Sequence, residues 1–284
     1  MRIQVGDIQL NHDVRGEGAP LIIINGFGAS SAGLRPEFVE GLARSFRVIT
    51  FDNRGTGLSD KPEEPVTIAR MADDAAGLLD ALGVARAHVM GISMGGMIAQ
   101  EVALRHPEKV LGLVLGCTNC GAPVSVPAAQ EILDLLTIPE GMDLREAARR
   151  GWASGYTPEF IEANRAFLES ILDRTLANPT PLATRTRQME AIRAWSTHER
   201  LGEIAAPTLV IAGDRDVLVP PENSRILHER IPDSRLHIVE GAAHVFPSSH
   251  PEETVRAVTE FLREVSADAG REAVGPGRVG TAGV

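Results

Sequence analysis

Five residues, 91–95, carry the clearest chemical signal in the chain, because they read Gly-Ile-Ser-Met-Gly. The apolar residues 87–90 before them are typical of a buried strand, and residues 94–106 have a helical pattern. A Gly-x-Ser-x-Gly segment between a strand and a helix makes a tight turn that exposes the serine hydroxyl. Small residues must flank the serine, since larger side chains would collide with the neighbouring strand and helix. The segment therefore predicts that Ser93 is a nucleophile.

A serine hydroxyl needs a general base at neutral pH, and a histidine in a loop after the last strand is the expected one. His244 follows the predicted strand Arg235–Val239 in the segment Glu-Gly-Ala-Ala-His. Two other late histidines fit less well, because His237 lies inside that strand and His250 lies at the start of a helix. We expect His244 to take the serine proton.

The base in turn needs a carboxylate that lies beyond a strand end, between the serine and the histidine in chain order. The segment Ile211–Asp216, Ile-Ala-Gly-Asp-Arg-Asp, offers two aspartates. Asp216 is further from the strand, where a turn can point it back at the histidine, whereas Asp214 is expected to cap the turn. The residues after the predicted strand Val110–Leu115, Gly-Cys-Thr-Asn-Cys, contain no acid, which favours Asp216.

Negative charge that develops on the substrate oxygen needs hydrogen-bond donors. One expected donor is the backbone N–H of Met94, directly after the serine. The other comes from residues 25–28, Asn-Gly-Phe-Gly, which follow the predicted strand Leu21–Ile24. Glycines let a backbone turn its N–H groups toward a ligand, so we expect the amide of Phe27 to be the second donor. A plain turn remains the alternative interpretation of the two glycines.

Strand and helix patterns alternate on both sides of these residues. The expected strands are Ile3–Val5, Ile8–Val14, Leu21–Ile24, Arg47–Phe51, Ala87–Met90, Val110–Leu115, Thr208–Ala212 and Arg235–Val239. The expected helices are Pro36–Arg44, Ile68–Leu82, Met94–His106, Glu222–Arg230 and Pro251–Val265. The first two strands form a hairpin around Gly6-Asp7. The alternation predicts the α/β class, with a mostly parallel eight-stranded sheet and helices on both of its faces.

Residues 121–200 interrupt the alternation, since they contain helical patterns and almost no strand signal. Apolar residues recur there at a helical spacing between positions 160 and 172. We expect a helical lid, or cap, inserted after the sixth strand over the carboxyl edge of the sheet, where ligands of such sheets bind. Trp152 and Trp195 in this region are candidate substrate-binding residues, and packing within the cap is their equal alternative.

The insertion divides the expected core into a first part, 1–120, and a second part, 201–266. Residues 267–284 contain Gly, Pro, Arg and small residues without periodicity. Such a composition cannot bury a core, so we expect a disordered tail.

The composition limits the classes of partner. The chain has 284 residues, of which 43% are hydrophobic, and a formal net charge of −10. An acidic chain disfavours binding to nucleic acid or to an anionic membrane through bulk charge. We find no membrane-spanning run and no signal-peptide pattern, so a cytoplasmic location is expected. Cys117 and Cys120 form a single Cys-x-x-Cys pair, which cannot supply four zinc ligands, so we expect buried free thiols and no metal.

The motifs together resemble the α/β-hydrolase fold superfamily over residues 1–265. The matching segments are 25–28, 52–59 (Asp-Asn-Arg-Gly-Thr-Gly-Leu-Ser), 91–95, 213–216 (Gly-Asp-Arg-Asp) and 241–244 (Gly-Ala-Ala-His). The resemblance implies a structural role for Asp52 and Arg54 beside the site. One departure is Asn25-Gly26, where the family usually has His-Gly. It leaves the backbone donors intact and removes any role for a histidine side chain.

The resemblance implies hydrolysis of a small carboxylic ester or lactone through an acyl-enzyme on Ser93, without a cofactor. The stretch 193–216 is similar to 3-oxoadipate enol-lactonases and related esterases. Haloalkane dehalogenases are disfavoured because they have an aspartate at the position of the serine. Cofactor-free perhydrolases and C–C bond hydrolases use the same triad and remain alternatives. A ligand receptor on the same fold is the alternative of another class.

Overall fold

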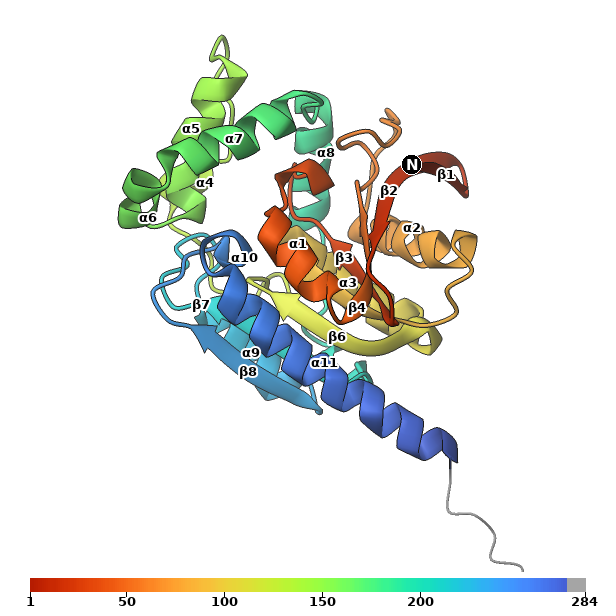
Figure 1. The fold of residues 1–284 in the computed structure, drawn as a ribbon. Helices are drawn as coiled ribbons and strands as arrows, with labels where there is room; N and C mark the ends of the chain where they lie inside the picture. Colours follow the sequence, from red (N-terminus) through yellow and green to blue (C-terminus); the bar gives the residue numbers. More distant parts are fainter. Residues whose placement is uncertain (275–284) are drawn as a thin grey trace, which may run out of the picture.

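The structure of the protein is a computed structural model, which describes the backbone of residues 1–274 and the side chains of residues 1–268. One sheet of eight strands runs in the order β1-β2-β4-β3-β5-β6-β7-β8 (Figure 1). The strands are β1 (Arg2–Val5), β2 (Ile8–Arg15), β3 (Ala19–Ile24), β4 (Phe46–Phe51), β5 (Ala87–Ile92), β6 (Val110–Gly116), β7 (Thr208–Gly213) and β8 (Ser234–Val239). β1 pairs with β2 and β2 with β4 in antiparallel fashion, and the remaining neighbours are parallel. The predicted mostly parallel sheet is confirmed.

The central strand β3 shows why the sheet is covered on both faces. Its last four residues, Leu-Ile-Ile-Ile, are all buried. Successive side chains of a strand point to opposite faces. Accordingly Ile22 and Ile24 belong to one hydrophobic cluster, and Leu21 and Ile23 belong to the other. A continuous apolar run is the pattern expected of a parallel strand between two helical layers.

Each hydrophobic cluster has its own set of helices. α1 (Pro36–Ala43) and α11 (Pro251–Val274) cover the face of Leu21 and Ile23, and Figure 1 shows them side by side. The opposite face carries α2 (Ile68–Ala81), α3 (Met94–Arg105) and α9 (Glu222–Arg230). The short helix α10 (Phe246–Ser249) follows the loop after β8. This two-layer cover leaves the carboxyl edge of the parallel strands to the connecting loops.

Helix α11 is longer than the sequence pattern predicts. It continues from the expected end at Val265 to Val274. Residues 267–274 of the expected tail are therefore helical, and residues 275–284 lie outside the described part of the chain. No helix among the described residues has both the length and the apolar character needed to cross a bilayer.

Five helices lie between β6 and β7, namely α4 (Gln130–Asp134), α5 (Leu144–Gly155), α6 (Pro158–Ala163), α7 (Arg165–Leu176) and α8 (Leu182–Arg193). We call them the inserted helices, and Figure 1 shows α4 to α7 beyond the edge of the sheet. The side chains of Asp143 and Thr157 cap the first turns of α5 and α6. The apolar stripe that the sequence suggests between positions 160 and 172 is broken at Asn164, where α6 ends and α7 begins.

Candidate active site

The turn between β5 and α3 holds Ser93 in a strained conformation. Its φ of 58° and ψ of −122° lie in a region that non-glycine residues rarely adopt. A Cβ on Gly91 would lie 2.1 Å from the carbonyl oxygen of Gly95, and a Cβ on Gly95 would lie 2.1 Å from that of Ile24. Both distances are far below van der Waals contact. The two glycines of the motif are thus required by backbone atoms that no repacking of side chains can move.

The loop after β3 lies directly against this serine. A Cβ on Gly26 would be 3.1 Å from the Ser93 Cβ and 3.7 Å from its Oγ. Among the described residues, the backbone N–H groups of Phe27 and Met94 have no hydrogen-bond acceptor. Met94 is only 1% exposed, and unpaired buried N–H groups are rare in proteins. Two free donors beside the serine are the arrangement that an oxyanion hole needs.

Asn25, where the family usually has histidine, fixes the start of this loop. It is buried, and its Nδ2 donates to the carbonyl oxygen of Phe51 at 2.9 Å. Its own carbonyl oxygen accepts from Nδ2 of Asn53 at 3.0 Å. The loop is held from its other side by α8, because Oε1 of Gln188 accepts the N–H of Gly28 at 2.8 Å. The backbone of β4 and side chains from its following loop and from α8 therefore set the position of the free donors.

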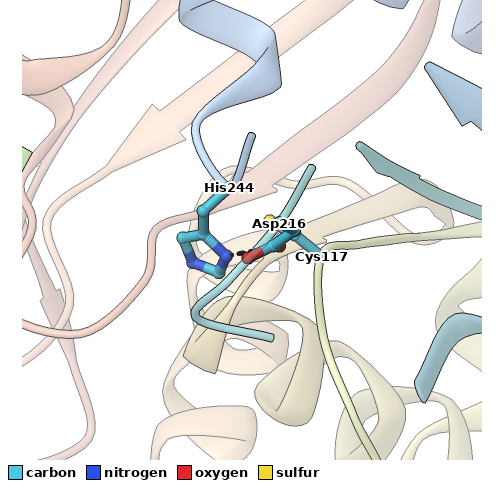
Figure 2. A group of neighbouring side chains, drawn as sticks. All are labelled: Cys117, Asp216 and His244. Atoms are coloured by element: carbon cyan, nitrogen blue, oxygen red, sulfur yellow. Dashed lines mark hydrogen bonds and ion pairs between the residues drawn. The ribbon is translucent and has the colours of Figure 1, made fainter. Parts of the chain in front are cut away.

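Asp216 and His244 form a buried pair. Nδ1 of His244 lies 2.8 Å from Oδ2 of Asp216, as Figure 2 shows. The other carboxylate oxygen accepts the N–H groups of Leu218 and Val219 at 2.9 and 2.8 Å. Asp214 instead accepts the N–H of Gly241 at 2.7 Å, at the surface. The two aspartates thus divide as the sequence suggests: one faces the histidine, and the other caps a turn.

The electrostatics of this pair favour a charged imidazole. Burial, the strongest single influence, opposes the charge, but the negative charge of Asp216 and the nearby sulfur of Cys117 outweigh it. Their combined effect raises the pKa of His244 well above its usual value. A carboxylate in this position stabilises the imidazolium that forms when a serine gives up its proton.

Cys117 is the site residue that sequence reasoning missed. It is buried and free, as expected, but its sulfur and one ligand atom each of Asp216 and His244 lie within 4.8 Å of one another (Figure 2). It directly follows β6 and adopts a φ of 39°. The available signal was its place at the end of the strand between those of the serine and the aspartate. A metal ion at these three side chains would have to displace the existing hydrogen bond between the carboxylate and the imidazole.

Strand order brings these residues to one edge. β5, β6, β7 and β8 are consecutive neighbours, and the loops after them carry Ser93, Cys117, Asp216 and His244. The backbone N–H of Ser93 donates to the carbonyl oxygen of Gly116 at 2.9 Å, which ties the turn to the end of β6. The Ser93 hydroxyl itself makes no hydrogen bond within the described chain. The structure therefore joins Asp216 to His244 and brings the serine to their edge, without a hydrogen bond to the histidine; such bonds often tighten only when substrate binds.

The two tryptophans differ in their surroundings. Nε1 of Trp195 donates to Oε1 of Glu101 at 3.0 Å, and its ring is buried in the cluster under α3. Trp195 therefore packs against the main core, and not within the cap as the packing alternative supposes. Trp152 is half-buried on α5. Its neighbour Gly151 lines a cavity of about 220 Å³, and Trp152 is not among the described residues around that cavity.

Residues 52–59 build a scaffold next to the loop after β3. The Asp52 carboxylate accepts hydrogen bonds from the N–H and hydroxyl of Ser31, from Nδ2 of Asn11 and from the N–H of Leu58. Arg54 is buried against Asp74, with its Nε 2.5 Å from Oδ2. Both side chains are thus occupied within the chain, which agrees with a structural role.

Comparison with known proteins places this geometry in a family. The family model described as the alpha/beta hydrolase fold matches residues 19–251. The chain belongs to this family. A protein from Azorhizobium caulinodans named "Putative carbamate hydrolase RutD" is 33% identical over 260 residues, which cover 92% of this chain and 97% of that protein. The poly(3-hydroxyalkanoate) depolymerase of Ectopseudomonas oleovorans is 32% identical over 86% of this chain and 84% of its own length.

Solved structures agree with this membership. The crystal structure of the enol-lactonase from Burkholderia xenovorans LB400 superposes with a TM-score of 0.81 at 26% identity, over 93% of this chain and all of the other. A hydrolase from Pseudomonas aeruginosa PA01 gives the same TM-score at 29% identity, over 92% and 97%. The protein is thus an α/β hydrolase. Membership of this family implies a small-molecule substrate.

Proposed function

We propose that this α/β hydrolase cleaves a carboxylic ester or lactone. Ser93 attacks the carbonyl carbon while His244 takes its proton, and Asp216 orients the imidazole and stabilises its charged form. The N–H groups of Phe27 and Met94 donate to the oxyanion. His244 then protonates the leaving alcohol, and water hydrolyses the acyl-enzyme.

The single observation that carries the proposal is the buried hydrogen bond between Asp216 and His244 at the strand edge that holds the strained Ser93. When Nδ1–H of a neutral imidazole donates to a carboxylate, Nε2 has a free lone pair that can accept a proton. The free donors beside the serine add the second requirement of acyl transfer, because they can bind the oxygen on which negative charge develops.

Carbamate hydrolysis is a second candidate, favoured by the name of the relative from Azorhizobium caulinodans. A carbamate carbonyl passes through a tetrahedral oxyanion as an ester carbonyl does, so the same residues serve both. Perhydrolysis and C–C bond cleavage also use the same three side chains. We further propose that the inserted helices act as a lid, with the core divided into residues 1–120 and 201–266 around residues 121–200.

Two steps test the proposal. A fluorophosphonate probe should label the wild-type protein and fail to label Ser93→Ala, while the exposed control Ser170→Ala labels normally. A panel of p-nitrophenyl esters of increasing acyl length, simple lactones and aryl carbamates then ranks kcat/KM by substrate class. Ester turnover that survives in Ser93→Ala would refute the mechanism. Tight ligand binding without labelling or turnover would instead favour a receptor.

A further inference from the structure

The side chain of Arg185 on α8 lies against the loop that carries the free donors. Its guanidinium carbon is 4.6 Å from the ring centroid of Phe27. Nη2 donates to the carbonyl oxygen of Leu136 at 3.0 Å. A Cβ on Gly28 would lie 2.2 Å from Nη1, so the guanidinium also lies directly against this glycine. The residue whose amide we assign to the oxyanion hole therefore has a cation on its ring.

No carboxylate of the described residues pairs with this cation. Arg185 makes no ion pair there, and one hydrogen bond uses only one of the five N–H donors of a guanidinium. Burial, with no compensating charge, lowers the pKa of Arg185. Arg185 is half-buried, and a charge that is withdrawn from water without a charged partner is costly for a folded protein. The arrangement fits a cation whose partner is a ligand.

Arg185 also lines the cavity of about 220 Å³ between the loop after β3 and the inserted helices. It is the one charged side chain among the described residues that surround this cavity. Most of the other large side chains there are aliphatic; they are Leu135, Leu136, Ile138, Leu144, Leu172 and Leu176. An apolar chamber with one cation suits an aliphatic arm that ends in an anion.

We propose that Arg185 binds a carboxylate on the acyl arm of the substrate, so that the enzyme prefers esters or lactones of dicarboxylic acids to neutral ones. The inference rests on the proposed function and names the substrate class of that site. The planar guanidinium can hold both oxygens of a carboxylate through parallel N–H donors. Phe27 links the two ends of such a substrate: its ring supports the cation, and its N–H faces the reacting carbonyl.

The test compares p-nitrophenyl monoesters of succinate, glutarate and adipate with the neutral pentanoate, hexanoate and heptanoate esters, after subtraction of the rate without enzyme. The wild-type protein should prefer the anionic series. We compare kcat/KM for the anionic esters with kcat/KM for the neutral esters as a ratio. Because Arg185→Met removes charge-assisted hydrogen bonds to the carboxylate, it should lower this ratio by about tenfold to a hundredfold. Arg185→Lys keeps the positive charge and loses the parallel N–H donors of the guanidinium. Its ratio should therefore lie between those of the wild-type protein and Arg185→Met.

Arg187→Met is the matched control, because Arg187 lies on the same helix, donates to the carbonyl oxygen of Pro62 and does not line the cavity. It should leave the ratio unchanged. Thermal melting checks that each variant folds. Equal losses of both ester series in Arg185→Met would overturn the proposal and would assign the arginine to positioning of Phe27. A wild-type preference for neutral esters would overturn it too.

A binding measurement separates this inference from the proposed function. Calorimetry with adipate should detect binding to wild-type protein and to Ser93→Ala, and no binding to Arg185→Met. If the wild-type protein hydrolyses no ester but binds adipate through Arg185, the ester mechanism fails and the carboxylate site stands. If esters are hydrolysed and adipate binds equally to Arg185→Met, the carboxylate site fails and the mechanism stands.

Discussion

Asp216 offers one carboxylate oxygen to Nδ1 of His244 at 2.8 Å and the other to the backbone N–H groups of Leu218 and Val219. The backbone contacts fix the carboxylate in the direction that the histidine needs. The aspartate is therefore held by its own loop, and the histidine is held by the aspartate. Changes at either residue should act on the same catalytic step.

Asp216→Asn should lower kcat by roughly 10³–10⁴-fold, because an amide at this position favours the wrong imidazole tautomer and no longer stabilises the imidazolium. Asp214→Asn is the matched control, since within the described part of the chain the carboxylate of Asp214 accepts only the N–H of Gly241, at the surface. It should change kcat by less than about threefold, the effect of an exposed turn residue. Steady-state kinetics on the best p-nitrophenyl ester measures both. Comparable losses in the two variants would contradict the assignment of the acid.

The raised pKa of His244 predicts a displaced pH profile. A general base must be neutral, so kcat/KM should rise with pH through a pKa above the usual 6.5. In Asp216→Asn, whatever activity remains should rise at lower pH, because the charge that raises the pKa is gone. A pH–rate series over the acid limb measures the shift. An unmoved limb in the variant would show that the carboxylate does not control the base.

The same pKa gives a stability prediction of definite sign. A pKa raised by folding means that protonated His244 contributes stability that is complete below its unfolded pKa, near 6.5, and is lost as the pH rises through the folded pKa. The difference in the free energy of unfolding between wild type and His244→Gln should therefore shrink as the pH rises through that window. Urea unfolding at a series of pH values measures it. A difference that grows with pH would contradict the charged pair.

Cys117 should tune this titration. Cys117→Ala removes the sulfur beside His244, which is one of the groups that raise its pKa, so the acid limb should move to lower pH. Cys120→Ala is the control, because Cys120 is buried in the same loop and is not a member of the cluster with His244. Each variant should lose about 1 kcal/mol of stability, typical for a buried substitution. Only Cys117→Ala should shift the profile, and identical profiles would exclude a role for the sulfur.

The glycine of the tight turn should be irreplaceable. A Cβ on Gly95 would lie 2.1 Å from the carbonyl oxygen of Ile24, so Gly95→Ala must displace β3 from α3. We expect a loss of about 3 kcal/mol in the free energy of unfolding, as for severe overpacking. Gly202→Ala is the control, since its Cβ would meet no atom within 4 Å. Urea unfolding compares the two variants, and similar stabilities would show that the turn can relax.

The predictable part of the fold is the part set by local patterns. Continuous apolar runs such as Leu21–Ile24 identify buried parallel strands, and the Gly6-Asp7 turn identifies the hairpin between β1 and β2. The approach of Asp216 to His244 also follows, because loops after neighbouring parallel strands meet at one edge. The division of the apolar stripe at Asn164 does not follow, since one polar residue in a helical pattern gives no sign of a chain reversal.

Two parts of the site lie beyond such patterns. The sequence predicts that Cys117 is an ordinary buried thiol. Its position near Asp216 and His244 depends on the order of β6 and β7 in the sheet. Arg185 is one of three arginines in α8, and only the packing of this helix on the loop after β3 singles it out. Long-range packing decides the positions of both Cys117 and Arg185, and the spacing of residues along the chain does not predict such packing.

The hydrogen bond from the N–H of Gly28 to Gln188 has a consequence for protein engineering. It connects α8, one of the inserted helices, to the loop whose N–H group at Phe27 we propose as a donor to the oxyanion. Grafting the insertion of a relative onto this core would thus alter turnover as well as substrate choice, unless the graft supplies an acceptor at the same point. An exchange of the inserted helices must therefore keep this one contact if the N–H groups of the loop are to hold their position.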